Sequence, residues 1–431
     1  MPALPRFEDS RDRRGDVRGD AHPHRARART GAGLTADRDV LITSPSELDE
    51  VVSSSRSARS IGMDTEFLRE KTYRAKLCLV QIATEDEIYL IDPLQGLDLG
   101  VVAGLIGDPE IEVIVHAGKQ DFELFYEDYG VVPTNVFDVQ LGAAFAGYGS
   151  SLPYGRLVSE LGGVQLVKGE SYTDWCRRPL TSSQTRYAAD DVRYLGAIGA
   201  RLKKELESLG RVEWAMEEMR RQFEDKESYR FDPSSAWRKV SGRGSLSSRQ
   251  LAILREVARW REETASNRNV PRGWLVKDPS LIEIARRGPS SPAELKGIRG
   301  FNAREADRSA RAIVAAVDAG RRGEAIESIP TPPKSAQARA RMLSGLADAV
   351  VRARCEEAKI ATELVTNRTE LEGLLAEVVN GSLEPSRHRI LNGWRRDLAG
   401  DAVLDLARGR IALKAIDRVP YIQEVPLDDE R

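Results

Sequence analysis

A series of short apolar segments begins near Val40 and alternates with helical patterns, and this alternation narrows the choice of fold more than any other part of the chain. The predicted strands cover residues 39–43, 60–67, 77–83, 87–91 and 112–116. The predicted helices cover residues 46–54, 97–106, 119–129, 139–146, 152–161 and 182–209. Three strands before the next helix indicate an antiparallel meander, and the later alternation indicates parallel crossovers, so we expect an α/β domain with a mixed sheet.

Two helical blocks are predicted after this domain. A stretch rich in Ser, Gly and basic residues follows Phe231 and leads to helical patterns at 249–267, 280–287, 292–298 and 302–319. A Pro-rich connector at 328–334 precedes further helical patterns at 336–358, 367–380, 388–398 and 401–408, in a block that runs to about Ile416. The expected units are a disordered tail at 1–38, the α/β domain at 39–210, a connecting segment at 211–244, helical domains at 245–325 and 336–420 joined by a linker at 326–335, and a tail at 421–431.

Charge is distributed unevenly along the chain. The 431 residues include 65 lysines and arginines against 67 aspartates and glutamates. Residues 39–208 hold 16 basic and 27 acidic side chains, whereas residues 235–320 hold 17 basic and 9 acidic ones. An acidic region followed by a basic region indicates that the two parts have different tasks.

The three cysteines, Cys78, Cys176 and Cys355, lie far apart and form no CxxC or Cys/His pattern. They support neither a disulfide framework nor a zinc site, so we expect Cys78 in the core and Cys176 partly exposed. No stretch approaches the ~18 apolar residues of a membrane span, and the first 38 residues lack the apolar core of a secretory signal. A cytoplasmic protein without a membrane partner is expected.

The first candidate site is Asp64 and Glu66 in the run IGMDTEF. On a strand, residues two apart project to the same side. Two neighbouring carboxylates on a buried strand are costly unless a positive charge lies between them, and a divalent cation is a suitable partner. A single D-x-E pattern is also typical of a surface salt bridge or of a strand edge.

Two further candidates lie later in the α/β domain. Asp121 follows His116 by five positions and falls in the opening turns of a predicted helix, although an acid there is also favoured by the helix dipole. His116 itself is interpreted as a buried, hydrogen-bonded histidine. Tyr187 and Asp191 are four apart on a predicted helix and share a face, whereas Asp190 turns away by about 100°. Ordinary packing would also explain this pair.

The candidates carry more information together than singly. Four acids and one tyrosine, from a strand, a helix start and a later helix, match the arrangement of a two-metal phosphodiester hydrolase, in which Mg²⁺ or Mn²⁺ takes oxygen ligands.

These motifs resemble the ribonuclease D family, in the tyrosine-containing subclass of the DEDD exonuclease superfamily. The resemblance rests on DTEF at 64–67, on H-x4-D ending at Asp121 and on Y-x3-D ending at Asp191. Flanking segments agree: REKTYRAKLCLVQIA at 69–83, FDVQ at 137–140 and GESYTDWCRRPLTSSQTRYAADDVRYL at 169–195. Residues 246–319 resemble the helicase-and-RNase-D C-terminal (HRDC) domain, and the last block resembles its more divergent second copy. The implied fold is a ribonuclease H-like exonuclease domain followed by two all-α HRDC-type bundles.

The resemblance also implies roles for the candidate residues. Asp64, Glu66 and Asp191 would hold a first divalent ion, and Asp64 would bridge to a second ion that Asp121 contacts largely through waters. Tyr187 would orient the attacking water, since a hydroxyl with a pKa near 10 suits positioning better than deprotonation. The implied activity is 3′→5′ hydrolysis of RNA with a free 3′ end, releasing nucleoside 5′-monophosphates, with tRNA precursors as substrates and a monomeric enzyme.

The basic HRDC region offers phosphate contacts without sequence reading. Trp237, Trp260, Trp274 and Phe301 could stack on bases there or pack in the helical core, and HRDC modules can also serve as protein contacts. Two other readings of the whole protein stay open. One is a nuclease for single-stranded DNA. The other is an RNA-binding scaffold whose catalytic site has decayed. The presence of all four acids and Tyr187 argues against this second reading.

Overall fold

The computed structural model describes residues 39–167, 173–230, 232–298, 303–326 and 332–427. The predicted tail at 1–38 lies outside the described residues, as do residues 327–331 of the predicted linker and 428–431 of the predicted C-terminal tail.

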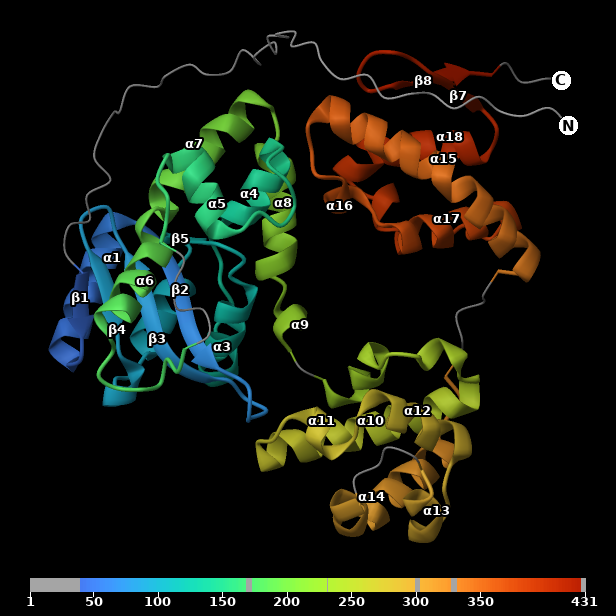
Figure 1. Ribbon diagram of the computed structural model, residues 1–431, viewed down its shortest axis with the longest axis horizontal. Coiled ribbons are helices and arrows are strands. Elements are labelled where there is room, and N and C mark those ends of the chain that lie inside the picture. The colour runs from blue at the N-terminus through green and yellow to red at the C-terminus, as the bar shows by residue number, and fades with distance from the viewer. Residues whose placement is uncertain (1–38, 168–172, 231, 299–302, 327–331, 428–431) are drawn as a thin grey trace, which may run out of the picture. The chain divides into compact units, whose positions relative to one another are not determined.

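A six-stranded mixed sheet forms the centre of the first domain, as the sequence predicts (Figure 1). Its strands run in the order β1-β4-β3-β2-β5-β6, with β2, β3 and β4 antiparallel and the other neighbours parallel. The strand bounds are β1 Asp39–Ile42, β2 Ser60–Leu68, β3 Lys76–Ala83, β4 Ile88–Ile91, β5 Glu112–Val115 and β6 Val136–Asp138. The sequence did not reveal β6, because three residues are too few to show an alternating pattern.

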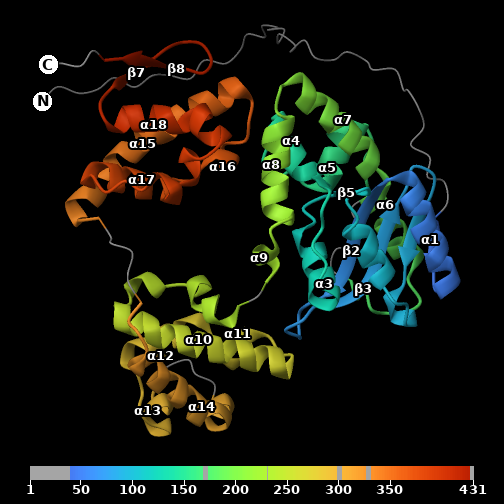
Figure 2. The ribbon, with the colours of Figure 1, turned by 180° about the vertical axis from the view of Figure 1, so that it is seen from behind.

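Helices surround this sheet: α1 Pro45–Ala58, α2 Gly100–Ile106, α3 Lys119–Tyr129, α4 Val139–Ala146, α5 Tyr154–Leu157, α6 Ser182–Arg193 and α7 Leu195–Ser208. The view from behind shows α1 and α3 clearly (Figure 2). The helix predicted at 182–209 is in fact two helices that meet at Tyr194. Helix α6 packs across β2, β3 and β4, so its residues lie over the middle of the sheet.

The predicted connecting segment at 211–244 contains regular structure. Helix α8, Val212–Phe223, buries Phe223 against Phe122 of α3, with ring centroids 5.6 Å apart, and α9, Lys226–Tyr229, follows. A 3₁₀ helix, Pro233–Lys239, then packs on the next helical block. The polar composition had suggested a linker, but Ala236 and Val240 are buried.

The second block has its own core. It consists of α10 Ser248–Arg268, α11 Arg272–Leu275, α12 Asp278–Arg287, α13 Pro292–Lys296 and α14 Ala303–Arg322. Ser247 begins α10 with a capping box that includes Gln250. Buried residues such as Leu254, Leu281 and Ile313 form a core separate from that of the sheet.

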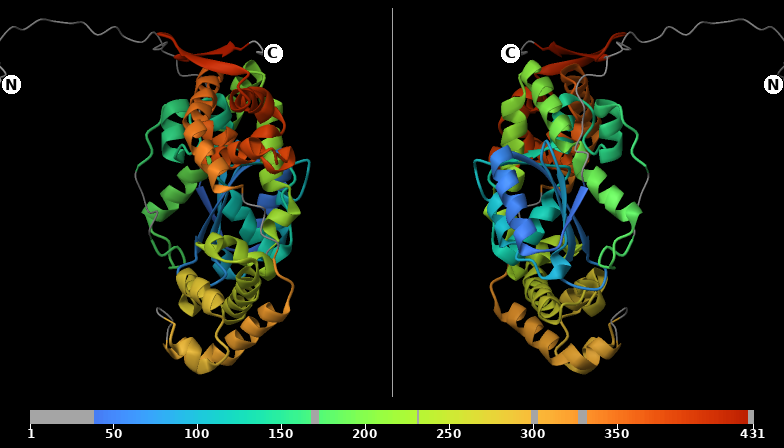
Figure 3. Two further views of the ribbon diagram at one scale, coloured as in Figure 1. Left: turned by 90° about the vertical axis from the view of Figure 1, so that its right-hand side faces the viewer. Right: turned by 90° about the vertical axis from the view of Figure 1, so that its left-hand side faces the viewer.

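The third block corrects the prediction of an all-α bundle. Its helices are α15 Lys334–Ala358, α16 Thr362–Val365, α17 Arg368–Asn380 and α18 Asp401–Ala407. Beyond the last predicted helix at 401–408, an antiparallel hairpin of β7, Ile411–Ala415, and β8, Ile422–Pro426, lies next to α18 and α15 (Figure 3). Gly409, with φ of 75°, follows the end of α18, and the β-branched residues Ile411, Ile422 and Val425 favour strands.

The third block also shares a core with the first domain. Trp394 stacks on Trp214 of α8 at 5.3 Å between ring centroids, and it contacts Phe145 of α4 edge-on. Beside it, the buried Arg395 pairs with the buried Glu218. This contact could not be predicted from the sequence, because apolar periodicity shows that a helix face is covered but not which element covers it.

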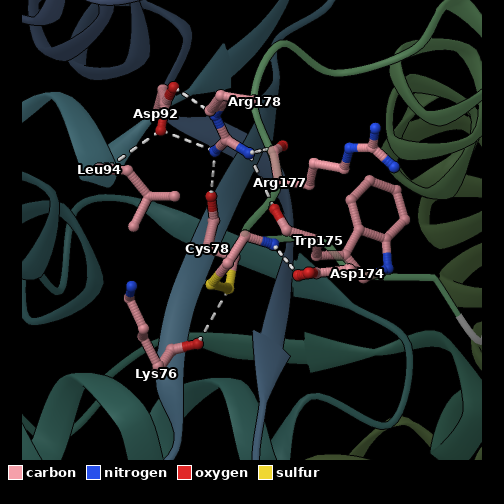
Figure 4. Close-up of a disulfide and its surroundings, with 9 residues drawn as sticks. Lys76, Cys78, Asp92, Leu94, Asp174, Trp175, Arg177 and Arg178 are labelled. Atoms are coloured by element: carbon pink, nitrogen blue, oxygen red, sulfur yellow. Dashed lines mark hydrogen bonds and ion pairs between the residues drawn. A yellow bond between two sulfur atoms is a disulfide. The ribbon is translucent and has the colours of Figure 1, made fainter.

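The expectation that the cysteines form no disulfide was wrong, although Cys78 is buried in the core and Cys176 is partly exposed, as expected. Cys78 of β3 and Cys176, which precedes α6, form a disulfide, with 98 positions between them in the sequence (Figure 4). Cys355 is a free, buried thiol. The pairing depends on how the chain folds back onto β3, which the spacing of the cysteines does not reveal. Within the described ranges, no helix combines the length and apolar character that crossing a membrane requires.

Candidate active site

Strand β2 presents Asp64 and Glu66 on one side of the sheet. Asp64 pairs with Gln81 and Glu66 with Leu79 on β3, and a bulge follows Glu66. Gly62 lies on the same side, where an added Cβ would come within 3.1 Å of the Leu195 Cβ and 3.2 Å of the Val192 carbonyl oxygen. The absence of a side chain at Gly62 therefore allows the junction of α6 and α7 to approach the strand that carries the acids.

Helix α6 brings Asp191 to these two carboxylates. Thr181 and Gln184 form a capping box that starts the helix. Ligand oxygens of Asp64, Glu66 and Asp191 all lie within 4.8 Å of one another. Tyr187, one turn earlier, hydrogen-bonds Asp191, which confirms that these two residues share a face. Three of the four predicted acids thus form a compact cluster.

Asp121 lies beside this cluster rather than within it. Its helix α3 begins at Lys119 after a sharp turn in which Ala117 has φ of 57°, and its side chain is buried. The hydroxyl of Thr65, between the two acids of β2, donates a hydrogen bond to Asp121. The sequence motifs did not point to Thr65, since an isolated threonine on a strand carries no functional signal.

Burial and mutual repulsion raise the pKa of every acid in the group. The pKa of Glu66 is raised to about 8, first by burial and then by the charges of Asp191 and Asp121. Burial raises the pKa of Asp121 to about 7 and, with the charge of Asp190 as a further cause, that of Asp191 to about 7. The pKa of Asp64 is raised well above its ordinary value by burial and by the charges of the other three carboxylates. A site of this kind favours a bound cation.

A cavity of about 200 Å³ contains the cluster. It is lined by Met63, Asp64, Glu66, His116, Tyr154, Tyr187, Asp191 and Leu195. A larger cavity of about 660 Å³ adjoins it and shares Tyr154, Tyr187 and Asp191. Its other lining residues are Pro153, Gly155 and Arg156 at α5, Ser159, Gln165, Leu166 and Val167 in the chain that follows, and Asp190 of α6. The acids therefore lie at the end of a hollow that is large enough for a nucleotide.

Two aromatic contacts shape the cavity. His116 places its Nε2 atom 2.9 Å from the Leu152 carbonyl oxygen and packs against the ring of Tyr154, which confirms its interpretation as a hydrogen-bonded histidine. Tyr154 had drawn no attention in the sequence. Its buried hydroxyl has no hydrogen-bond partner among the described residues. The ring of Tyr187 packs 5.9 Å from that of the buried Trp175.

The donor set fits hard divalent cations. Each acid contributes carboxylate oxygens, which Mg²⁺ and Mn²⁺ prefer. Within the part of the chain that the structure describes, no lysine or arginine forms an ion pair with Asp64, Glu66, Asp121 or Asp191. The nearest such pair joins Arg193 to Asp190 and Asp39. The negative charge of the cluster is thus left for a metal ion to balance.

Comparison with known proteins agrees with the fold. The 3′-5′ exonuclease family matches residues 40–207, and the HRDC domain family matches residues 250–317. The solved structure of Escherichia coli RNase D, an exoribonuclease involved in structured RNA processing, superposes with a TM-score of 0.75 at 30% identity. The match covers 86% of this chain and 99% of that one. The fold and the acid cluster thus define a nuclease with a 3′–5′ exonuclease domain and an HRDC domain.

Whole-chain relatives make the assignment more specific. Ribonuclease D of Gluconacetobacter diazotrophicus is 37% identical over 385 residues, which cover 87% of this chain and 94% of that protein. Ribonuclease D of Bartonella henselae is 33% identical over 375 residues, with 86% and 90% covered. The chain belongs to the ribonuclease D family of 3′–5′ exoribonucleases.

Proposed function

We propose that this protein removes nucleotides one at a time from the 3′ end of RNA at the acid cluster of β2, α3 and α6, with Mg²⁺ or Mn²⁺ as cofactor. The observation that supports this most strongly is the convergence of Asp64, Glu66 and Asp191, which are far apart in the chain or on different elements, within 4.8 Å. The products would be nucleoside 5′-monophosphates.

Each residue of the cluster has a distinct task in this proposal. Asp64, Glu66 and Asp191 would hold one divalent ion, and Asp64 with Asp121 would serve a second. When bound, two such ions supply a more acidic water and stabilise charge on the leaving 3′ oxygen. Thr65 fixes the orientation of Asp121 by its hydrogen bond. The hydroxyl of Tyr187 orients the attacking water, because it lies next to Asp191 at the mouth shared by the two cavities.

The larger cavity is the proposed site for the 3′-terminal nucleotide. Its lining combines aromatic and aliphatic side chains, such as Tyr154 and Leu166, with polar ones such as Gln165. Apolar surface supports a base of any identity, so a free 3′ end rather than base sequence would select the substrate. Precursors of tRNA are the proposed physiological substrates, since their maturation requires trimming from the 3′ side.

The HRDC block is proposed to grip RNA away from the catalytic site. Besides the excess of basic residues, Trp274 of α11 is 58% exposed, flanked in the chain by Arg272 and Lys277. By contrast, Trp237 and Trp260 pack partly buried against the core of this block, and Phe301 lies outside the described residues. Among the three tryptophans described in this block, Trp274 is thus the most exposed and the best suited to stacking.

The proposal also covers the domain boundaries, the oligomeric state and the location of the protein. We assign the exonuclease domain to residues 39–210 and the HRDC domain to 245–325, with a second HRDC-like domain at 336–420, in a monomeric cytoplasmic enzyme. Gel filtration with light scattering would test the monomer: a mass near the 47.8 kDa of one chain supports it, and a multiple of that mass contradicts it.

A time course on tRNA precursors with extended 3′ ends tests the function. With Mg²⁺ or Mn²⁺, we expect stepwise shortening from the 3′ end and release of 5′-monophosphates, and with EDTA we expect none. Faster cleavage of a single-stranded DNA of the same sequence would assign the site to DNA instead. Binding of RNA without hydrolysis under all metal conditions would favour a scaffold.

A further inference from the structure

Residues 173–181 connect the disulfide to the candidate active site. This segment precedes α6, the helix that carries Tyr187 and Asp191. Trp175 is buried within it and packs against the ring of Tyr187. Thr173 accepts a hydrogen bond of 2.9 Å from the Gln184 side-chain amide in the first turn of α6. The position of the segment therefore determines the surroundings of Tyr187.

Two anchors fasten the segment to the sheet (Figure 4). The first is the disulfide between Cys176 and Cys78 of β3. The second is the guanidinium of Arg178, which donates two hydrogen bonds to Asp92, at 2.6 and 2.7 Å, and one of 2.6 Å to the Cys78 carbonyl oxygen. Arg178 also donates to the Trp175 carbonyl oxygen at 2.8 Å. Both anchors thus hold neighbouring residues of one segment to β3, and the polar anchor also holds them to Asp92, which follows β4.

We propose that Cys78 and Cys176 form a reversible thiol–disulfide site that exchanges with small-molecule disulfides and, when oxidised, fixes segment 173–181 and Tyr187 for catalysis. Two observations support reversibility. Cys176 is partly exposed, so a small molecule can reach its sulfur, while Cys78 is fully buried next to it. The Arg178 anchor does not depend on the disulfide, so the two thiols stay near one another after reduction.

The exchange balances with one small disulfide as oxidant. The Cys176 thiolate attacks one sulfur of that molecule, whose S–S bond breaks and releases the first small thiol. The Cys78 thiolate then attacks the Cys176 sulfur of the mixed disulfide, forms the protein disulfide and expels the second small thiol. Two electrons pass from the protein thiols to the small molecule, and their two protons end on the released thiols. Two small thiols reverse the sequence.

The oxidised and reduced forms of the protein share one fold and differ in the mobility of segment 173–181. With the disulfide formed, Trp175 and the start of α6 are held covalently to β3. With both thiols reduced, only non-covalent contacts restrain them: the polar anchor of Arg178, the packing of Trp175 on Tyr187 and the bond of Thr173 to Gln184. In a compartment kept reducing, the pair would stay reduced until small disulfides accumulate. We therefore expect oxidation to raise kcat severalfold, with KM for RNA unchanged.

Thiol counting on the full chain tests the chemistry without any measurement of activity. The protein is equilibrated with mixtures of reduced and oxidised glutathione, quenched in acid, denatured and alkylated, and its mass is determined. We expect two of the three cysteines to lose alkylation together as the oxidised fraction rises, and to regain it when reduced glutathione is added back. Cys355 serves as an internal control, because burial raises the pKa of its thiol to about 11 and keeps it unreactive. Persistent alkylation of Cys78 and Cys176, or a stable glutathione adduct on Cys176, overturns the proposal.

The variants Cys176→Ser and Cys355→Ser test whether the disulfide affects segment 173–181 and catalysis. Cys355→Ser is the matched control. In the wild type and in Cys355→Ser, oxidation should slow amide hydrogen exchange in residues 173–181 and raise kcat, and in Cys176→Ser it should change neither. A disulfide that forms without altering exchange or kcat would contradict the role of the segment. The kcat measurement alone rests on the proposed function: if the protein proved to have no exonuclease activity, the thiol count and the exchange rates would still decide the inference.

Discussion

The catalytic role of Tyr187 follows less directly from its contacts than the metal-binding role of the acids does. It lies against Asp191 and Trp175 and lines both cavities. Phenols are weak acids that do not lose their proton readily at neutral pH. Its contribution is therefore expected to come from orientation of water rather than from proton removal.

Replacing Tyr187 by Phe should lower kcat by roughly tenfold to a hundredfold, because the ring stays while the hydrogen bond to the attacking water is lost. Binding of Mn²⁺, measured by calorimetry, should change little. Tyr89→Phe is a suitable control, since this buried tyrosine of β4 bonds Glu87 away from the site. Unchanged turnover in Tyr187→Phe would remove the proposed role.

The raised pKa values predict how pH affects stability without metal. Glu66, Asp121 and Asp191 have pKa values of about 7 to 8 in the folded chain, against about 4 in an unfolded one, and the pKa of Asp64 is raised in the same direction. Between these values the folded chain binds more protons, so its stability decreases as the pH rises. We expect the Tm of EDTA-treated protein to fall from about pH 5.5 to about pH 8.5, and stabilisation by Mn²⁺ to grow over the same range.

Asp64→Asn provides the control for this pH dependence. It removes one of the repelling carboxylates, so its Tm in EDTA should be higher at alkaline pH and should vary less with pH. A Tm that rises with pH in the wild type, or an equal slope in the variant, would contradict the account of the cluster.

At the level of elements, the placement of α6 depends on a buried ion pair. Asp92 follows β4, and its side chain is 1% exposed, while that of Arg178 is 20% exposed. The pair keeps the pKa of Asp92 low against the opposing effect of burial. Loss of the guanidinium would leave Asp92 buried without its partner.

Arg178→Gln is therefore expected to reduce the free energy of unfolding by about 3 kcal/mol or more and to lower kcat, because the segment before α6 loses its polar anchor. Urea unfolding followed by tryptophan fluorescence measures the effect. Arg59→Gln breaks a pair whose side chains are both 76% exposed, and it should cost less than about 0.5 kcal/mol. An equal loss of unfolding free energy in the two variants would show that the buried pair contributes no more to stability than the exposed pair.

Elements with a clear period could be predicted from the sequence, and elements set by distant contacts could not. The bounds of α3 and α4 agree with the prediction, since each helix has a strong apolar face and a glycine at its end. The break at Tyr194 was missed because the helical pattern continues through it.

The acids of the site could be found because carboxylates on a buried strand are unusual. Thr65, Tyr154 and the cysteine pair could not, because each matters only through a neighbour that folding supplies.

At the scale of the whole molecule, catalysis and RNA binding are proposed to lie in different parts of the chain. The last block stabilises the exonuclease domain directly, through the stacked Trp394 and the buried pair of Arg395 and Glu218. The HRDC block has a separate core and an exposed tryptophan. Point variants therefore test RNA binding more cleanly than a truncation, which would expose the shared core.

Trp274→Ala should weaken binding of a tRNA precursor by roughly tenfold, as expected for the loss of one stacked base, while kcat at saturating RNA stays the same. Fluorescence anisotropy at fixed salt measures the Kd. Tyr421→Ala, which removes another exposed aromatic side chain, from the turn between β7 and β8, should leave the Kd unchanged. If Trp274→Ala binds as tightly as the wild type, the HRDC surface around this residue does not hold RNA.

The whole account depends on a divalent metal site formed by residues from separate elements. Hydrolysis of a 3′-extended RNA by wild type and Asp191→Asn, with the released nucleotides identified by mass and RNA binding measured in parallel, tests this directly. We predict 5′-monophosphates from the 3′ end with the wild type, and unaltered RNA binding with no detectable hydrolysis with Asp191→Asn. Near-full activity of Asp191→Asn would contradict the metal site and the mechanism built on it.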